Sequence, residues 1–413
     1  MIRKSFKLSN IIFVIIIIIF TTRLFNYANW NPTLAGWCSY FLYGYLMLIT
    51  YNNKSSIQRI RSPFSKWIKI IIGLHLLCII TMFIIYDQSP IEGKTLLFSL
   101  MIFFSFYYYH LYNASEKTII QIFTVIGLCI FAIQIVQQFF PNMAVFGIRN
   151  AENNENVEAI AEVRNGLYRY RLSGVFFVLF CLYYYWSELL HKISLKNSVF
   201  FFIFFSSMYL FLTRQIMLAT LVTLALSSFF VTNKKRRITI LAITAVFVGI
   251  IFYYSDALFG ELINKTQEQA SEDNIRAVAF SVYWNRITSN ILTFFFGNGY
   301  PPEFHSLQEN MRLFTSDIGF VGQMYHYGVI WILFYFYTLY VMIIKYRRRI
   351  PLYIRLFLFG TAVNSVMVFP CSSPYEFLIW SSIMYICSLY ITNNTRQLNK
   401  SCKAKNKILN ENS

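Results

Sequence analysis

Long apolar runs recur along this sequence, and they restrict its possible folds more than any other feature. Two examples are Ile11–Phe20 ("IIFVIIIIIF") and Val199–Leu212 ("VFFFIFFSSMYLFL"). A helix of about 20 mostly apolar residues crosses a bilayer, because lipid offers no hydrogen-bond partner to an open backbone. Charged residues make up only 13% of the chain, whereas soluble domains contain about a quarter. The sequence therefore predicts an all-α polytopic membrane protein.

The apolar runs divide the chain into about twelve predicted transmembrane helices. Their approximate ranges are 11–25, 34–51, 67–86, 95–112, 118–140, 172–190, 198–212, 216–232, 238–255, 318–344, 352–370 and 374–392. No small-residue cleavage site follows the first run, so it is expected to remain as a span. We expect residues 1–392 to form one transmembrane helical domain and the polar residues 393–413 to form a disordered tail.

The placement of basic residues predicts the direction of the spans. If the N-terminus is cytoplasmic and the spans alternate, the lysine-rich and arginine-rich connections all fall inside, as the positive-inside rule requires. These connections include "KSSIQRIRSPFSK", "HKISLK", "NKKRR" and "KYRRR". Both termini are then cytoplasmic, and two long loops, 141–171 and 256–317, are extracytoplasmic. The net charge of +18 is thereby a topology signal, and no nucleic-acid partner is expected.

The predicted outer side carries arginine in preference to lysine. Its arginines are Arg149, Arg164, Arg169, Arg171, Arg214, Arg276, Arg286 and Arg312, beside only Lys94 and Lys265. The planar guanidinium donates two parallel hydrogen bonds to phosphate or carboxylate, which a lysine ammonium cannot do. An anionic ligand is therefore expected at the outer face. The alternative is that each arginine reaches lipid headgroups or pairs with a nearby glutamate.

Two segments of the outer loops carry candidate residues for binding a glycan. In the first loop, Arg164, Arg169 and Arg171 alternate with Tyr168 and Tyr170. Such a mixture of donors and aromatic rings suits sugars, although tyrosine is also common at membrane interfaces. Arg164, Arg169, Tyr170 and Arg286 are the candidates for glycan contact.

The second loop contains a predicted amphipathic helix. Its apolar positions, Ile275, Ala279, Val282, Ile287 and Ile291, are spaced for one helix face, so this helix is expected to lie on the membrane surface or to cap the bundle.

Two titratable residues near the tenth predicted span are candidate catalytic bases. Asp317 opens the span and is either its N-cap or a proton acceptor that faces outward. His326 lies nine residues further on and is either a packing residue or a base. The histidines and cysteines lack metal-ligand spacing, and no Walker loop or GxGxxG motif is present. We therefore expect neither a metal nor a cofactor.

Several short motifs, in their order, resemble the O-antigen polymerases of the Wzy type, which share a superfamily with the O-antigen ligases. The motifs are "RLSG" at Arg171–Gly174, "TRQ" at Thr213–Gln215, and "IR…W…FGNG…SDIGFVGQMYHYG" from Ile275 to Gly328. The resemblance implies a glycosyltransferase in the bacterial inner (plasma) membrane with an extracytoplasmic active site. Its substrates would be undecaprenyl-diphosphate-linked repeat units, polymerised into O-antigen or capsule without a metal or cofactor.

The resemblance also implies roles for individual residues. Arg171, Arg214 and Arg276 occupy the motif positions expected to hold the diphosphate. Asp317 is the first choice as base and His326 the second, because ligases have a histidine where Asp317 stands here. A flippase and a chain-length regulator of the same pathway are expected partners.

Two other functions stay open at this point. An O-antigen ligase would transfer finished glycan to lipid A core or to protein. A flippase for lipid-linked oligosaccharide would carry its charges inside the spans, around a central cavity. In this sequence the charges and aromatic residues gather in the two outer loops.

Overall fold

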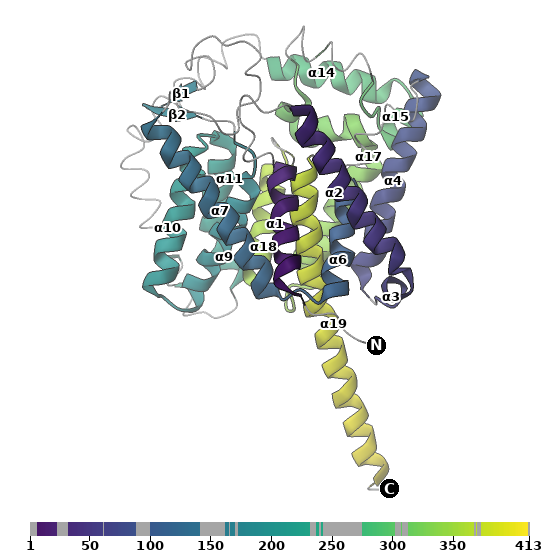
Figure 1. Cartoon of the computed structure of the whole chain (residues 1–413), viewed down its shortest axis with the longest axis vertical. Coiled ribbons are helices and arrows are strands. Elements are labelled where there is room, and N and C mark those ends of the chain that lie inside the picture. Colours follow the sequence, from purple (N-terminus) through teal and green to yellow (C-terminus); the bar gives the residue numbers. More distant parts are fainter. Residues whose placement is uncertain are drawn as a thin grey trace.

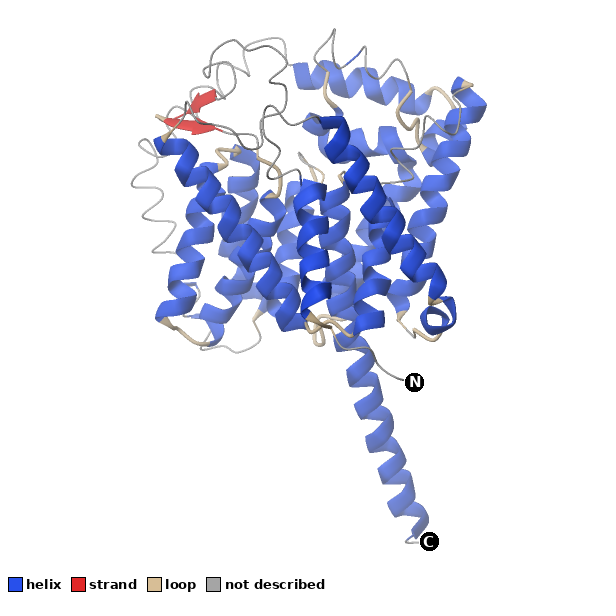
Figure 2. Cartoon of the chain, in the orientation of Figure 1, coloured by secondary structure: helices blue, strands red, loops and turns tan. Residues whose placement is uncertain are grey.

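The computed structural model of the chain is a bundle of helices with a small two-stranded hairpin (Figures 1 and 2). It describes residues 6–22, 32–60, 62–87, 100–140, 162–164, 166–169, 172–231, 237–238, 241–242, 275–301, 307, 313–366, 369 and 373–411. Within these ranges, the side chains of 32–35, 162–164, 169, 214, 317 and 393–411 are not described.

The first half of the bundle contains helices of very different lengths. Its elements are α1 (Leu8–Thr22), α2 (Pro32–Asn52), α3 (Lys54–Gln58), α4 (Pro63–Tyr86), the 3-10 turn η1 (Ile102–Phe104), α6 (Ser105–Tyr112), α7 (Glu116–Phe139), strands β1 (Glu162–Arg164) and β2 (Leu167–Arg169), α9 (Val175–His191) and α10 (Leu195–Leu210). Strands β1 and β2 pair antiparallel, with Val163 opposite Tyr168.

The second half contains α11 (Arg214–Leu226), the 3-10 turn η3 (Ser227–Phe230), α14 (Ile275–Thr288), α15 (Ile291–Phe296), the 3-10 turn η4 (Thr315–Ile318), α17 (Gly319–Tyr340), the π-helical turn η5 (Val341–Lys345), α18 (Leu352–Asn364) and α19 (Pro374–Glu411). Helix α14 lies across one end of the bundle, as Figure 1 shows.

The helices have the composition expected of a membrane-embedded protein. Among the described residues, three helical segments are long and apolar enough to cross a membrane: α4, α7 and Gly319–Lys345. Five shorter apolar segments, within α1, α9, α10, α11–η3 and α18, accompany them. Among the described residues, eleven of the twelve predicted spans overlap helices, most of them with shifted ends. The other, 238–255, lies almost entirely outside the described residues, and the number and direction of the spans stay predictions.

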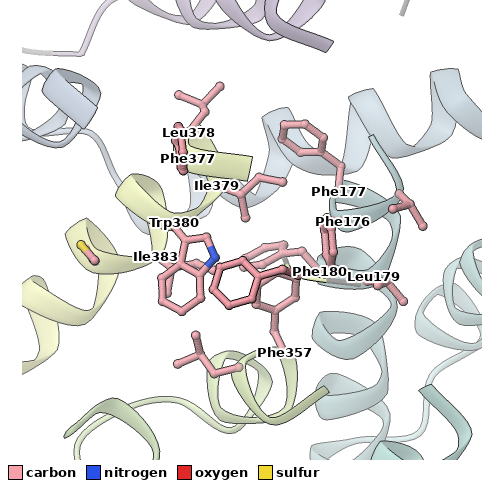
Figure 3. Packing of buried hydrophobic residues seen from close by; sticks show 14 of the residues in the cluster. Phe176, Phe177, Leu179, Phe180, Phe357, Phe377, Leu378, Ile379, Trp380 and Ile383 are labelled. Carbon is pink, nitrogen blue, oxygen red and sulfur yellow. The ribbon is translucent and has the colours of Figure 1, made fainter. Parts of the chain in front are cut away.

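Aromatic side chains fill the centre of the bundle, where α9, α18 and α19 meet (Figure 3). The ring of Phe180 on α9 lies 5.6 Å from that of Tyr353 and 5.7 Å from that of Phe357, both on α18. Edge-to-face pairs of this kind add to the free energy gained from burial alone. These contacts hold α9 and α18 side by side.

The described parts of both long loops lie at the same end of the bundle. Figure 1 shows β1, β2, α14 and α15 at this end, together with the beginning of α11. We call it the loop end. Helix α3 lies at the opposite end, where α19 also leaves the bundle.

The predicted polar tail, residues 393–413, follows the last predicted span. The backbone of α19 continues as helix to Glu411 and extends away from the bundle in Figure 1. Residues 393–411 contain neither glycine nor proline, so nothing in the backbone interrupts the helix that the preceding span begins.

Candidate functional site

The candidate site lies at the loop end, where α11 begins. Helix α10 ends at Leu210, and α11 starts at Arg214 after a turn of three residues. Within this turn, Leu212 is fully buried and has a left-handed backbone with φ 48°. A left-handed backbone is unfavourable for leucine, so the free energy gained by burying the Leu212 side chain stabilises the turn. Arg214 is therefore the first residue of α11, although its side chain lies outside the described part.

A hydrogen-bonded pair joins the beginning of α11 to the beginning of α14. With the amide of Gln215 oriented so that its oxygen faces Arg276, that oxygen accepts hydrogen bonds from Nη1 and Nη2 of Arg276 at 3.2 and 3.1 Å. Gln215 follows Arg214 directly, and Arg276 is the second residue of α14. Two of the three arginines predicted to hold a diphosphate therefore belong to segments that meet.

Helix α9, which follows the third of these arginines, is bonded to α11. Tyr183 of α9 is hydrogen-bonded to Thr220 and Thr223 of α11. Both helices begin at the loop end and run away from it (Figure 1). Arg171 precedes α9 but lies outside the described residues, as does Tyr170.

The predicted amphipathic helix is present as α14, but its buried face differs from the prediction. Ala279, Tyr283 and Ile287 are buried, whereas Ile275 is 56% exposed and Ile291 belongs to α15. The spacing of apolar residues did not predict Tyr283 at the centre of the buried face, because tyrosine also has a polar hydroxyl. The hydroxyl of Tyr283 donates to the carbonyl of Leu313 at 2.8 Å, which satisfies its polar atom inside the protein.

Arg286, a candidate for glycan contact, is half-buried on α14. Its guanidinium lies next to Tyr283 and is hydrogen-bonded to Tyr325 of α17. Burial raises the pKa of the Tyr283 phenol to about 12, and the charge of Arg286 acts in the opposite direction. Tyr283 therefore stays protonated, and Arg286 joins α14 to α17.

A glycine-rich loop holds α17 at a break in that helix. Gly328 has φ 81° within α17 and interrupts the helical hydrogen bonds. The backbone N–H groups of Asn298 and Gly299 donate to the carbonyls of Tyr325 and His326 at 2.6 and 3.0 Å. The loop thus bonds carbonyls in the turn before the break. Gly297 allows this approach, because a Cβ there would lie 2.3 Å from the His326 oxygen.

His326 is buried between this loop and η4, and both of its ring nitrogens have partners. Nδ1 lies 2.7 Å from the carbonyl oxygen of Gly299, and Nε2 lies 3.1 Å from Oγ1 of Thr315. A carbonyl only accepts, so Nδ1 carries the proton and Nε2 accepts from the Thr315 hydroxyl. The ring also stacks on Tyr300 with centroids 4.2 Å apart. This arrangement suits a residue that holds two segments together.

Asp317 lies in η4, the turn that His326 holds. The sequence offered an N-cap as one reading of Asp317, but the N-cap position of α17 is Ile318, so that reading is wrong. Gly319, the first residue of α17, has a left-handed backbone with φ 53° directly after the turn. Gly322 lets α17 pass against η4, because a Cβ at Gly322 would lie 2.0 Å from the Thr315 carbonyl oxygen. The turn that carries Asp317 is consequently packed on α17, and the side chain of Asp317 lies outside the described part.

The hairpin carries the other two candidates for glycan contact. Arg164 ends β1 and Arg169 ends β2, with side chains outside the described part. Gln138 of α7 anchors the hairpin, because its amide accepts from the N–H of Tyr168 at 2.9 Å and donates to the same residue's carbonyl. In Figure 1 the hairpin and α14 occupy different sides of the loop end.

Sequence reasoning missed the residues that support the candidates. Gln215, Gln138 and Thr315 were given no role, although Gln215 lies inside the "TRQ" motif. Among the described residues, no group of three His, Cys, Asp or Glu side chains is placed to hold a metal ion. The sequence matches no protein-family model and no curated protein with which it was compared.

Proposed function

We propose that this protein polymerises undecaprenyl-diphosphate-linked oligosaccharide repeat units into surface polysaccharide, O-antigen or capsule, on the outer face of the bacterial inner (plasma) membrane. The observation that carries the proposal is the Gln215–Arg276 pair, because it brings together two segments with arginines expected to hold a diphosphate. Turn η4, which carries Asp317, packs against α14, and the hairpin with Arg164 and Arg169 lies at the same loop end as α14.

Among the described residues, Gln215 is a neutral partner of Arg276, which suits a cation that must bind an anion. A glutamate in place of Gln215 would orient the guanidinium equally well but would cancel its charge. The amide oxygen of Gln215 orients Arg276 and adds no negative charge of its own. Arg276 is itself exposed, so an incoming diphosphate can reach it.

In the proposed reaction, the bond between the anomeric carbon of the growing glycan and the diphosphate oxygen breaks. Undecaprenyl diphosphate leaves with the bonding electrons, and negative charge on its oxygen grows in the transition state. The guanidinium groups of Arg214, Arg276 and Arg171 bind the diphosphate more strongly in the transition state than in the ground state, because its leaving oxygen is then more negative. A hydroxyl of the acceptor repeat unit bonds to the anomeric carbon, and Asp317 takes the hydroxyl proton.

Deletion of the gene, followed by a gel of surface glycans, tests the proposal. A ladder that collapses to a single repeat is the expected result. Loss of all attached glycan, with polymer still made on the carrier, would instead identify a ligase. Repeat units held on the cytoplasmic side would identify a flippase.

Complementation of the deletion strain tests the arginines. Arg214→Lys and Arg276→Lys should each lower polymer formation by about 10²–10³, because lysine keeps the charge but loses the paired donors. Arg347→Lys, at an exposed position after η5, is the matched control and should restore the ladder. A full ladder with Arg276→Lys would rule out diphosphate binding by that residue.

A further inference from the structure

Helix α14 carries a row of three residues that starts at Arg276. Phe280 and Trp284 follow at intervals of four, so the three side chains lie along one stripe of the helix. The rings of Phe280 and Trp284 are nearly parallel, with an interplanar angle of 5° and centroids 5.9 Å apart. Their side chains are 45% and 39% exposed. A pair of exposed, aligned aromatic rings therefore continues from the arginine.

This aromatic pair is outside the packed core of the protein. The face of α14 that contacts the bundle consists of Ala279, Tyr283 and Ile287. Phe280 and Trp284 lie on a flank of that face, the flank toward which Arg276 also projects. Packing against the bundle consequently leaves a large part of both rings uncovered.

The opposite face of α14 is mainly polar, with Val278, 48% exposed, as its apolar member. Ser281, Asn285 and Thr288 lie there, and all three are exposed. A helix immersed in lipid would present apolar residues at these positions. The aromatic pair thus lies between the face that packs on the bundle and a mainly polar, exposed face. Arg276 is next to it, so a polar ligand with an apolar surface can bind there.

We propose that Phe280 and Trp284 form a subsite for sugar rings of the lipid-linked glycan whose diphosphate is held at Arg276. The proposal rests on the proposed function. The C–H face of a pyranose is apolar and slightly positive, so it stacks on the negative face of an aromatic ring. Along α14, Phe280 and Trp284 follow Arg276 by about 6 and 12 Å, in the order in which sugars follow the diphosphate in the substrate.

Kinetics of the purified protein with lipid-linked repeat units tests the subsite. The double variant Phe280→Ala with Trp284→Ala should raise KM about 3- to 10-fold with little change in kcat, since stacking contributes modestly to binding. Alanine preserves the helix, and inhibition by inorganic pyrophosphate should be unchanged because Arg276 remains. Trp284→Phe should restore most of the affinity. Val278→Ala, which removes an exposed apolar side chain elsewhere on α14, is the matched control and should leave KM unchanged.

An unchanged KM in the double variant, or an equal rise with Val278→Ala, would overturn the subsite while leaving the proposed function intact. Failure of the wild-type protein to elongate any lipid-linked repeat would instead count against the proposed function. Tryptophan fluorescence then tests the subsite independently of the reaction. The emission of Trp284 is obtained by subtracting the spectrum of the Trp284→Phe variant from that of the wild-type protein. Oligosaccharide released from the carrier by mild acid should shift this emission. Strong quenching by brominated lipids, without a response to oligosaccharide, would show that lipid covers the rings and would overturn the proposal.

Discussion

At the scale of single residues, neutral amides orient Arg276 and hold the backbone of the hairpin. Gln215 faces Arg276 with an amide, and Gln138 holds the hairpin that carries Arg164 and Arg169. An amide supplies directional hydrogen bonds without a compensating charge. An amide partner therefore orients Arg276 without neutralising it.

The neutrality of Gln215 is directly testable. Gln215→Glu should leave the fold intact but lower polymer formation about tenfold or more, because the new carboxylate neutralises Arg276. Asn290→Asp is the matched control. Asn290 caps α15 by accepting from Leu292 N at 2.8 Å, and aspartate caps equally well. Equal activity of the two variants in a polymerisation assay would show that the charge of Arg276 is not used.

Substitutions of His326 provide a second test. They distinguish a structural role, in which the ring joins two segments, from a role as the catalytic base. His326→Asn places an amide nitrogen near the position of Nδ1, so it can still donate to Gly299, and we expect activity within about tenfold of wild type. His326→Ala loses both hydrogen bonds and the stack on Tyr300, and should lower activity and stability together. If His326 is instead the base, both variants should lose about 10²–10⁴ in rate. Rates measured beside thermal unfolding distinguish the two roles.

At the scale of elements, glycines determine how α17 meets its neighbours. Gly322 faces the carbonyl of Thr315, and Gly328 faces the carbonyl of Phe295, at distances that leave no space for a side chain. Both glycines belong to the segment "SDIGFVGQMYHYG" that carries the family resemblance. Part of that motif therefore has a packing reason that is separate from catalysis.

A pair of glycine substitutions tests this packing. Gly322→Ala should lower the free energy of unfolding by about 1–3 kcal/mol and displace η4, because its Cβ would meet backbone rather than a mobile side chain. Gly73→Ala in α4 is the control. A Cβ there meets nothing within 4 Å, so alanine should be neutral or stabilise by up to about 1 kcal/mol. Thermal unfolding in detergent compares the two, and equal stabilities would contradict the close contact.

At the scale of the whole molecule, the described parts of both long loops share one end of the bundle. If that end is extracytoplasmic, a membrane-impermeant maleimide should label Ser281→Cys on α14 in intact cells. It should label Ser55→Cys on α3 only after permeabilisation, because α3 lies at the opposite end. Labelling is measured against the wild-type chain with its own cysteines. The reverse pattern would invert the predicted topology.

Helix positions were largely predictable, whereas the contacts between helices were not. Spans such as α4 and α7 follow from the length of apolar runs, which the thickness of a bilayer sets. The buried face of α14 was predicted only in part, because Tyr283 is amphipathic and finds its partner, Leu313, in another segment. The capping reading of Asp317 failed because local sequence does not distinguish a 3-10 turn from the first turn of the following helix.

The sequence by itself determined that the chain forms apolar helices, roughly where each begins, and which polar loops separate them. These properties depend on local composition and on the backbone's need for internal hydrogen bonds in lipid. Only the tertiary structure decided that Gln215 meets Arg276, that His326 holds the turn of Asp317, and that Phe280 and Trp284 are left exposed. Such contacts join residues far apart in the chain, and they depend on how helices pack rather than on the sequence around any one of them.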